Sequence, residues 1–396
     1  MDITITPGKL TGNLSAIPSK SQAHRLLICA AFADAPTNII CPETNWDMDA
    51  TADCLRALGA SISRTETGYS VHPVDILPKT AILPCGESGS TLRFLLPVVG
   101  ALGVEGTFKM EGRLSQRPLS PLWEVMEDHG CALSRPTGDT IRCCGRLRAG
   151  RYSIDGGVSS QFITGLLLSL SLLPEKSTLE ITGKIESAPY IRMTEKAMEL
   201  FGISATDLGS GQFRSPGQIT VEGDWSNGAF FLAANALGSN IAVGNLDLNS
   251  PQGDRAVAEI LPLLKSECAT ISAADIPDLV PILSVVAAAN HGAVFTNIQR
   301  LRLKESDRVA SVIAMLTALG CKATATEDTL TVSSATLIGG TVDSCNDHRI
   351  AMAAAIAATV CTEKVTILGA ESVNKSYPHF WAEYRRLGGN YEQYIR

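Results

Sequence analysis

Positive charge gathers at points where the sequence predicts that buried helices begin. Lys20 and Arg25 lie in "PSKSQAHR", directly before the apolar run "LLICAAF". Pro18 and Ser19 suit a helix cap, so both cations lie near the helix end that carries partial positive charge. Cations are least favourable there, and a bound phosphate or carboxylate would offset the repulsion. We therefore interpret this segment as a local anion-binding site.

Four further predicted helix starts carry polar side chains of the same kind. The segment "GESGSTLR", 86–93, is rich in small residues, which lets backbone N–H groups approach an anion closely. The segment "VSSQF", 158–162, offers neutral donors for phosphate oxygens, while "IPD", 276–278, and "NDHR", 346–349, add charged groups. Ser, Asp and Asn are good helix caps on their own, but capping does not explain the interleaved Lys, Arg and Gln.

Charged residues also gather in "GRLSQRP", 112–118, "LRLKESDR", 301–308, and "NKSYPHF", 374–380. For the second of these, a solvated helix face with salt bridges is the alternative interpretation. With the helix starts they supply seven candidate cations, namely Lys20, Arg25, Arg117, Lys304, Arg308, Arg349 and Lys375. Seven cations are enough for two anionic ligands, and Asp278 and Glu305 are candidates for proton transfer among them.

The sequence lacks the common cofactor and metal motifs. It contains no Walker motif, no Rossmann Gly-x-Gly-x-x-Gly and no His cluster with the spacing of metal ligands. We therefore expect chemistry without a metal or cofactor.

The overall composition narrows the class of partner. The chain has 396 residues, 45% of them apolar, and a formal net charge of −7. This acidic balance argues against a broad surface for nucleic acid or an anionic membrane. The 11 cysteines include no Cys-x-x-Cys pair, and neither a signal peptide nor a membrane-spanning stretch is evident. We expect a cytoplasmic monomer that acts on small molecules.

A repeated pattern organises the chain into six α/β units. Apolar helix-like runs after polar starts recur at Lys20, Ser90, Ser160, Asn227, Asp278 and Asp347, with steps of 70, 70, 67, 51 and 69 residues. Amphipathic helices that end in Gly, together with β-prone stretches, lie between these runs. The order strand, buried helix, strand, amphipathic helix and further strands predicts parallel strands joined by crossovers.

The length of this period predicts two domains. It exceeds the usual range of solenoid repeats, so we expect three units in each of two domains rather than a rod. One domain comprises residues 18–222, and the other comprises residues 1–17 plus 223–396. The chain would cross between them twice, which predicts a double-crossing hinge with a cleft between the domains.

The sequence resembles the EPSP synthase family of enolpyruvyl transferases. The matching motifs occur in the family's order along nearly the whole chain, and they are "PSKSQAHR", "GESGSTLR", "RPLSPL", "VSSQF", "SAPYI", "IPD", "KESDR", "NDHR" and "NKSYP". The resemblance implies two similar domains, each of three βαβαββ units in an inverse α/β barrel-like arrangement. It also implies transfer of the enolpyruvyl group of phosphoenolpyruvate to the 5-hydroxyl of 3-phosphoshikimate, through a tetrahedral intermediate and without metal. Phosphate is the second product of this step of the shikimate pathway.

The resemblance further implies which residues bind each substrate. For 3-phosphoshikimate these are Lys20, Ser21, Arg25, Ser159, Ser160, Gln161, Ser187, Tyr190, Asp278, Arg300 and Lys304. For phosphoenolpyruvate these are Lys20, Gly89, Arg117, Gln161, Arg308, Arg349 and Lys375. The catalytic residues that it implies are Asp278 as the base for the 5-hydroxyl, with Glu305, Lys375 and His348 for proton transfer at the methylene carbon, and Lys20.

Two positions depart from the family's commonest pattern. Glu87 and Ser88 stand where many members have Asn and Ala, which places a carboxylate near the expected phosphoenolpyruvate. Arg300 stands where many members have an Asn that contacts the sugar phosphate. Gly89 is retained, so no side chain at that position blocks the inhibitor glyphosate.

Three other interpretations explain fewer of these features. The sibling transferase that acts on UDP-N-acetylglucosamine usually carries a reactive cysteine in the loop matching 112–118, and this loop has none. RNA 3′-phosphate cyclase shares the βαβαββ unit but needs a nucleic-acid surface, which the acidic balance disfavours. A non-catalytic anion-binding module would not explain why Asp278 and Glu305 lie among the cations.

Overall fold

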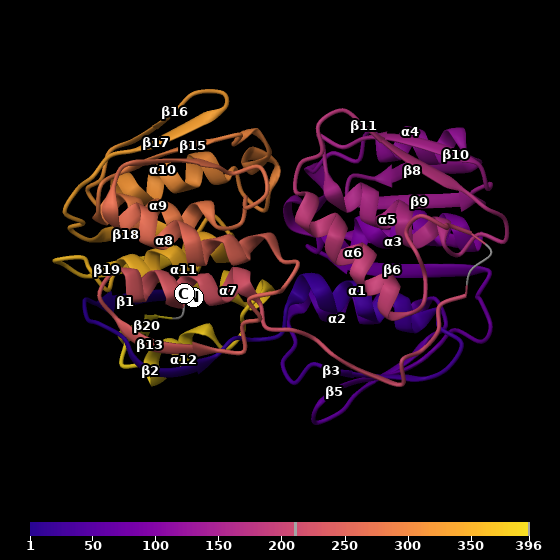
Figure 1. Cartoon of the computed structure of the whole chain (residues 1–396), viewed down its shortest axis with the longest axis horizontal. Helices are drawn as coiled ribbons and strands as arrows, with labels where there is room; N and C mark the ends of the chain where they lie inside the picture. Colours follow the sequence, from indigo (N-terminus) through magenta and orange to yellow (C-terminus); the bar gives the residue numbers. More distant parts are fainter. Residues whose placement is uncertain (210–211, 395–396) are drawn as a thin grey trace. The chain divides into compact units, whose positions relative to one another are not determined.

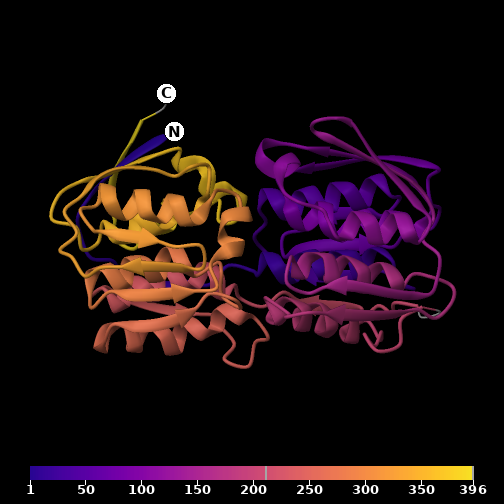
Figure 2. The ribbon, with the colours of Figure 1, turned by 90° about the horizontal axis from the view of Figure 1, so that it is seen from above.

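The computed structural model describes residues 1–209 and 212–394, and the chain forms two compact units. Unit 1 comprises Met1–Ile17 and Gly223–Arg396, and unit 2 comprises Pro18–Glu222. Within each unit, helices lie on the inside and β-sheets lie around them (Figures 1 and 2). In the described part of the chain, no helix combines the length and apolar character needed to cross a membrane.

Unit 2 contains two four-stranded sheets and one two-stranded sheet. The sheet orders are β12-β3-β5-β4, β6-β7-β9-β8 and β10-β11, and the first two strands of each are parallel. In chain order the elements are α1 (Lys20–Ala31), β3 (Thr37–Ile40), α2 (Trp46–Ala57), β4 (Ser61–Arg64), β5 (Gly68–His72), β6 (Thr80–Gly86), α3 (Gly89–Leu102), β7 (Glu105–Met110), the 3₁₀ turn η1 (Gly112–Gln116), α4 (Leu122–Asp128), β8 (Cys131–Thr137), β9 (Thr140–Gly145), β10 (Arg151–Asp155), α5 (Ser160–Leu170), β11 (Thr178–Thr182), α6 (Ala188–Leu200) and β12 (Gln218–Thr220).

Unit 1 repeats this arrangement. Its sheet orders are β18-β19-β1-β20, β14-β15-β17-β16 and β13-β2, again with a parallel pair in each. The elements are β1 (Asp2–Thr6), β2 (Thr11–Ser15), α7 (Trp225–Ala236), β13 (Asn240–Gly244), η2 (Gly253–Ala256), α8 (Val257–Ser266), β14 (Ala269–Ser272), α9 (Val280–Ala289), β15 (Ala293–Thr296), η3 (Gln299–Leu303), α10 (Arg308–Ala318), β16 (Ala323–Ala325), β17 (Thr329–Val332), β18 (Gly340–Asp343), α11 (His348–Ala357), β19 (Val365–Leu368), η4 (Ala370–Lys375), α12 (Phe380–Arg386) and β20 (Asn390–Tyr394).

In the part of the chain that the structure describes, four of the six repeats have the full βαβαββ pattern, and two show no final hairpin. Between α6 and β12, the described residues form the isolated bridges Ser177–Leu208 and Ala33–Phe213, and β12 itself pairs with β3 of the first repeat. After α8, only Glu267 and Cys268 precede β14, so no hairpin fits between these elements. The missing hairpin accounts for the short step of 51 residues between the fourth and fifth helix starts.

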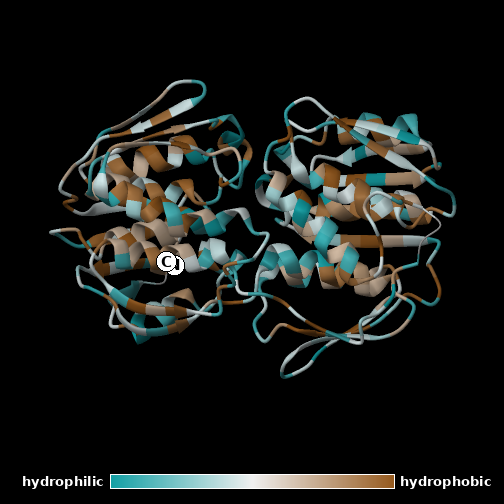
Figure 3. Ribbon diagram, viewed as in Figure 1, coloured by the Kyte–Doolittle hydropathy of each residue, from teal (hydrophilic) through white to brown (hydrophobic). Residues whose placement is uncertain are grey.

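The first helix of each repeat forms the core because it is apolar on nearly every side. Every residue of α11 is buried, as is every residue of α1 from Ala23 to Ala31. Helices α3 and α5 pack so closely that a Cβ atom on Gly165 would lie 2.3 Å from the backbone oxygen of Arg93. Figure 3 shows apolar residues concentrated on these inner helices. The N-terminal ends of the core helices carry most of the polar residues described below.

Candidate active site

The start of α1 holds Lys20 in an ion pair. Ser19 caps the helix, because its Oγ accepts a hydrogen bond from the backbone N–H of Gln22 at 3.4 Å. The Lys20 Nζ lies 2.8 Å from Oδ2 of Asp47 at the start of α2, and both side chains are largely buried. Asp47 therefore neutralises the cation that the helix end disfavours.

The guanidinium of Arg25 is buried and links α1 to α6 through hydrogen bonds. It donates to the backbone oxygens of Ser21 at 2.5 Å and Tyr190 at 2.9 Å, and to Oγ1 of Thr194 at 2.8 Å. Its Cζ also lies 4.9 Å from the ring centroid of Phe94. Burial lowers the pKa of Arg25 to about 10, so it stays protonated at neutral pH. The structure thus places Arg25, Ser21 and Tyr190 together.

The start of α5 contacts α3 through Gln161. The Gln161 Nε2 donates to Oγ of Ser90 at 3.0 Å, and its Oε1 accepts from Nη1 of Arg93 at 2.7 Å. Arg93 also donates from Nη2 to the backbone oxygen of Pro118 at 2.9 Å. Arg93, which is not among the expected ligand contacts, therefore connects Gln161 to the segment that follows Arg117. Two serines adjoin this point, since Ser159 caps α5 and Ser160 is buried beside it.

The start of α3 lies directly against Arg117. Ser88 caps α3, and its Oγ accepts from the backbone N–H of Thr91 at 3.2 Å. A Cβ atom on Gly89 would lie 2.5 Å from Nη1 and 3.0 Å from Cζ of Arg117. The guanidinium therefore lies beside the N-terminal end of α3, an arrangement suited to an anion.

Glu87 contacts the 3₁₀ turn that precedes Arg117. A Cβ atom on Gly112 would lie 2.6 Å from Oε2 of Glu87, and Gly112 has a φ of +51°. A side chain at position 112 would therefore meet both backbone strain and the carboxylate. We infer that Glu87 helps to position the turn η1, which leads to Arg117.

In unit 1, three cations surround the carboxylate of Asp278. The Lys304 Nζ lies 3.4 Å and the Arg308 Nη1 2.5 Å from its Oδ1, and the Arg349 Nη2 lies 3.3 Å from its Oδ2. Burial opposes ionisation of Asp278, but Arg349, Lys304 and Arg308 outweigh it and hold the pKa of the carboxyl well below its usual range. Asp278 is therefore a stable anion within a cationic cluster.

Arg308 at the start of α10 joins three carboxylates. Besides Asp278, it binds Oε2 of Glu305 at 2.6 Å and Oδ2 of Asp347 at 2.8 Å, and its side chain is 1% exposed. Asp347 also caps α11 and accepts from Oγ of Ser306 at 3.0 Å. Burial lowers the pKa of Arg308, but the carboxylates, led by Asp347, raise it well above its usual value overall.

Four further expected residues are Lys304, His348 and Lys375 in unit 1 and Ser187 in unit 2. Burial lowers the pKa of Lys304 to about 8; Asp278 opposes this shift, whereas the charges of Arg308 and Arg300 contribute to it. His348 is buried at the start of α11, and the Nζ of Lys375 donates to the backbone oxygen of Asn346 at 2.8 Å. In unit 2, Ser187 occupies the N-cap position of α6 in the left-handed conformation, with a φ of 57°.

Asp254 is a buried residue of this region that the sequence motifs did not indicate. The Oδ2 of Asp254 accepts a hydrogen bond from Oγ of Ser226. The Ser226 Oγ in turn accepts a hydrogen bond from Nη2 of Arg349 at 3.0 Å. Burial, and then repulsion from Asp278, raise the pKa of Asp254 to about 7. Asp47 and Thr194 were also absent from the expected set. The polar helix start "NWDMDA", 45–50, contains Asp47 and is the one sequence sign of it.

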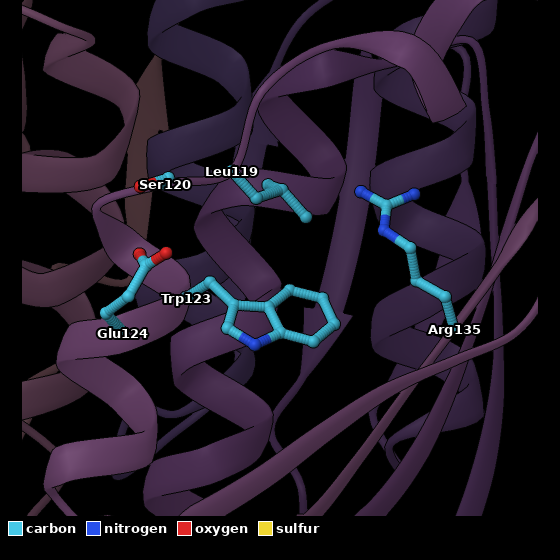
Figure 4. A pocket seen from close by; sticks show the side chains of 5 residues that line it. All are labelled: Leu119, Ser120, Trp123, Glu124 and Arg135. Atoms are coloured by element: carbon cyan, nitrogen blue, oxygen red, sulfur yellow. The ribbon is translucent and has the colours of Figure 1, made fainter.

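Unit 2 also has a surface pocket of about 420 Å³. It is lined by Leu119, Ser120, Trp123, Glu124 and Arg135 on and near α4 and β8 (Figure 4). Figure 4 shows the Trp123 indole between Glu124 and Arg135, and the Arg135 Cζ lies 5.8 Å from the indole centroid. None of the expected site residues lines this pocket. Elsewhere in residues 1–209 and 212–394, no cluster of three or more His, Cys, Asp or Glu is arranged to hold a metal ion.

The chain matches a known family model along most of its length. The model of EPSP synthase (3-phosphoshikimate 1-carboxyvinyltransferase) covers residues 5–275 and 262–384. The chain belongs to the EPSP synthase family. The 3-phosphoshikimate 1-carboxyvinyltransferase of Clostridium kluyveri is 37% identical to it, over 99% of this chain and 98% of the relative. The enzyme of the same name from Clostridium beijerinckii is 35% identical, over 99% of both chains.

Solved structures share the fold of this EPSP synthase family member. EPSP synthase from Acinetobacter baumannii aligns with a TM-score of 0.79 at 22% identity, over 99% of this chain and 100% of the other. The enolpyruvyl transferase NikO from Streptomyces tendae aligns with a TM-score of 0.76 at 16% identity, over 99% and 98%. These likenesses confirm the two-domain α/β class that the repeats predicted.

The raised pKa of Asp254 predicts a pH-dependent stability. Because the folded state holds this proton more tightly than the unfolded chain, the free energy of unfolding should fall as pH rises from about 4 to 7. Asp254→Asn removes this loss, which amounts to about 1.4 kcal/mol for each unit of raised pKa. Urea unfolding across this pH range should show that the free energy of unfolding of the variant rises, with increasing pH, relative to that of the wild type. The same trend in Glu259→Gln, on the exposed side of α8, would refute the assignment.

Proposed function

We propose that this protein transfers the enolpyruvyl group of phosphoenolpyruvate to the 5-hydroxyl of 3-phosphoshikimate. The products are 5-enolpyruvylshikimate 3-phosphate and phosphate. The observation that carries the proposal is the match, over 99% of the chain, to relatives named 3-phosphoshikimate 1-carboxyvinyltransferase. The three cations around Asp278, which are Lys304, Arg308 and Arg349, support it, because both substrates are anionic.

Addition comes first in the proposed reaction. The 5-hydroxyl oxygen attacks C2 of phosphoenolpyruvate, Asp278 accepts the hydroxyl proton, and a second proton reaches C3 to give a methyl group. Asp278 is ionised but a weak base while three cations surround it. When substrate anions engage Lys304, Arg308 and Arg349, their pull on Asp278 weakens and its basicity rises. Substrate binding would thus activate the base.

Elimination then regenerates the double bond. A base removes one proton from the methyl group while the bond between C2 and the bridging oxygen breaks, so that phosphate leaves. We assign proton transfer at this carbon to Glu305, Lys375 and His348, with Lys20 balancing charge. Arg308 contacts Glu305 directly at 2.6 Å, and this ion pair positions the Glu305 carboxylate.

The proposal divides the binding residues between the substrates. We assign to 3-phosphoshikimate Lys20, Ser21, Arg25, Ser159, Ser160, Gln161, Ser187, Tyr190, Asp278, Arg300 and Lys304. We assign to phosphoenolpyruvate Lys20, Gly89, Arg117, Gln161, Arg308, Arg349 and Lys375. We further propose that units 1 and 2 are the enzyme's two domains and that it acts as a cytoplasmic monomer, without nucleic acid or membrane, in keeping with its net charge of −7.

Phosphate release tests the function. Purified protein should release phosphate only when both 3-phosphoshikimate and phosphoenolpyruvate are present, and chelation of metals should leave the rate unchanged. Release with UDP-N-acetylglucosamine instead of 3-phosphoshikimate would assign the protein to the sibling transferase.

The contact between Gly89 and Arg117 predicts a selective binding defect. In Gly89→Ala the new Cβ would lie 2.5 Å from Nη1 of Arg117, so the flexible guanidinium must move away from the helix start. We expect the KM for phosphoenolpyruvate to rise about tenfold, the loss of roughly one charge-assisted hydrogen bond, with the fold intact. Steady-state kinetics measure this, and Gly138→Ala, which meets nothing within 4 Å, is the matched control. A rise confined to the KM for 3-phosphoshikimate would contradict the assignment.

A further inference from the structure

A chain of buried hydrogen-bonding side chains runs from α1 through α2 to the start of α3. The His24 Nδ1 lies 2.7 Å from Oγ1 of Thr51, which lies 2.6 Å from Oγ1 of Thr91. The Thr91 hydroxyl donates to Oγ of Ser88 at 2.7 Å. The first three residues are 0% exposed and Ser88 is 1% exposed, so water does not compete for these bonds.

The hydroxyl protons fix the direction of this chain. Each hydroxyl has one proton, and the proton of Thr91 points to Ser88. Thr51 must therefore donate to Thr91, which leaves the Thr51 oxygen to accept from His24. His24 then carries its proton on Nδ1. Its Nε2 is a buried atom without a hydrogen-bond partner in the described structure.

The surroundings of His24 keep the ring neutral. Burial, followed by the charges of Lys20 and Arg25, lowers the pKa of His24 well below 6.5. The ring packs edge-on against Phe94, with 6.2 Å between the centroids. A second proton on Nε2 would have no acceptor, so the geometry and the charges both favour the neutral Nδ1–H form.

The far end of the chain reaches the candidate active site. Ser88 caps α3, and the next residue, Gly89, lies against Arg117. The Thr91 hydroxyl also lies 3.4 Å from the backbone oxygen of Asp47, whose side chain pairs with Lys20. The chain thus connects the helix start beside Arg117 with the helix that carries Lys20.

We propose that His24 is a positioning residue for enolpyruvyl transfer, which fixes the start of α3 through Thr51 and Thr91 and so holds Gly89 and Arg117 in place for phosphoenolpyruvate. His24 touches neither substrate in this account. The inference rests on the proposed function for its kinetic consequence, but the hydrogen-bond chain and the tautomer do not depend on that function.

Two pairs of variants separate the hydrogen bond from packing. His24→Phe keeps a ring but removes the donor, whereas His24→Asn keeps an N–H near the position of Nδ1. Thr51→Val breaks the chain without changing side-chain size, whereas Thr51→Ser retains the hydroxyl. We expect the KM for phosphoenolpyruvate to rise five- to tenfold in His24→Phe and Thr51→Val and to stay within twofold in the two conservative variants. The KM for 3-phosphoshikimate should stay within twofold in all four.

Cys29→Ala, also fully buried in α1, controls for lost packing and should leave both KM values unchanged. An unchanged KM for phosphoenolpyruvate in His24→Phe and Thr51→Val, in an active enzyme, would overturn the proposal. So would an equal rise in the conservative variants or in Cys29→Ala. Wild-type protein that releases no phosphate from the two substrates would instead refute the proposed function.

A spectroscopic measurement tests the chain independently of activity. Selective ¹⁵N labelling of histidine, with the His24 signal assigned by its loss in His24→Phe, should show a neutral Nδ1–H ring from pH 6 to 8. An Nε2–H tautomer, or a charged ring in this range, would overturn the proposal. This readout needs no turnover, so it tests the tautomer of His24 even if His24→Phe is too unstable for kinetics. In that case Thr51→Val and Thr51→Ser supply the kinetic comparison.

Discussion

Asp278→Asn is expected to lower kcat about a thousandfold or more. The variant loses the proposed acceptor of the 5-hydroxyl proton, and general-base catalysis contributes roughly 10²- to 10⁴-fold. It also leaves Lys304, Arg308 and Arg349 without the anion that they surround. Phosphate release under saturating substrates measures the effect.

A nearby carboxylate provides the matched control for Asp278. Asp275 lies in the same turn and is exposed, and Asp275→Asn should retain kcat within about twofold, as is usual for exposed positions. Near-normal turnover in Asp278→Asn would remove this residue from the role of base. A loss of equal size in Asp275→Asn would show that the turn, rather than the carboxylate of Asp278, is what matters.

Arg308→Met is expected to lower the free energy of unfolding of unit 1 by about 3–5 kcal/mol at neutral pH. The change removes the Arg308 cation from Glu305, from the fully buried Asp347 and from Asp278. The pKa of Asp278 is depressed in the folded protein, so this stabilisation is present above its unfolded pKa and is lost toward acid. The deficit should therefore shrink as pH falls below about 4.

Tryptophan fluorescence can report on unit 1 alone. Of the four tryptophans, Trp225 and Trp381 lie in unit 1, so the background Trp46→Phe/Trp123→Phe restricts the signal to that unit. Arg302→Met, which removes an exposed ion pair of 3.7 Å with Asp307, should cost less than about 1 kcal/mol. A similar small cost for Arg308→Met would mean that the buried network contributes little to stability.

Local patterns made the starts of the core helices predictable. The capping residues Ser19 and Asp347 stand beside their apolar runs in the sequence, and the structure shows each accepting the expected backbone hydrogen bond. The recurrence of such starts also predicted the α/β class, because buried helices between β-prone stretches leave few alternatives. The family follows from nine motifs in order and is confirmed by the family model.

Contacts between distant segments were not predictable in the same way. Asp254 contacts Ser226, which lies 28 residues before Asp254 in sequence, and Ser226 contacts Arg349. No local sequence pattern predicts contacts of this kind. The pairing of Lys20 with Asp47 likewise depends on how α1 packs against α2. The two shortened repeats show a further limit, since a missing hairpin appears in sequence only as the short step before Asp278.

The position of bond cleavage in phosphoenolpyruvate tests the proposed reaction most directly. With ¹⁸O in the bridging oxygen and 3-phosphoshikimate as acceptor, addition and elimination should transfer all of the label to the released phosphate. The carbon product, 5-enolpyruvylshikimate 3-phosphate, should carry none of it by mass spectrometry. Label retained in a carbon product, with unlabelled phosphate, would mean that the phosphorus–oxygen bond breaks and would contradict enolpyruvyl transfer.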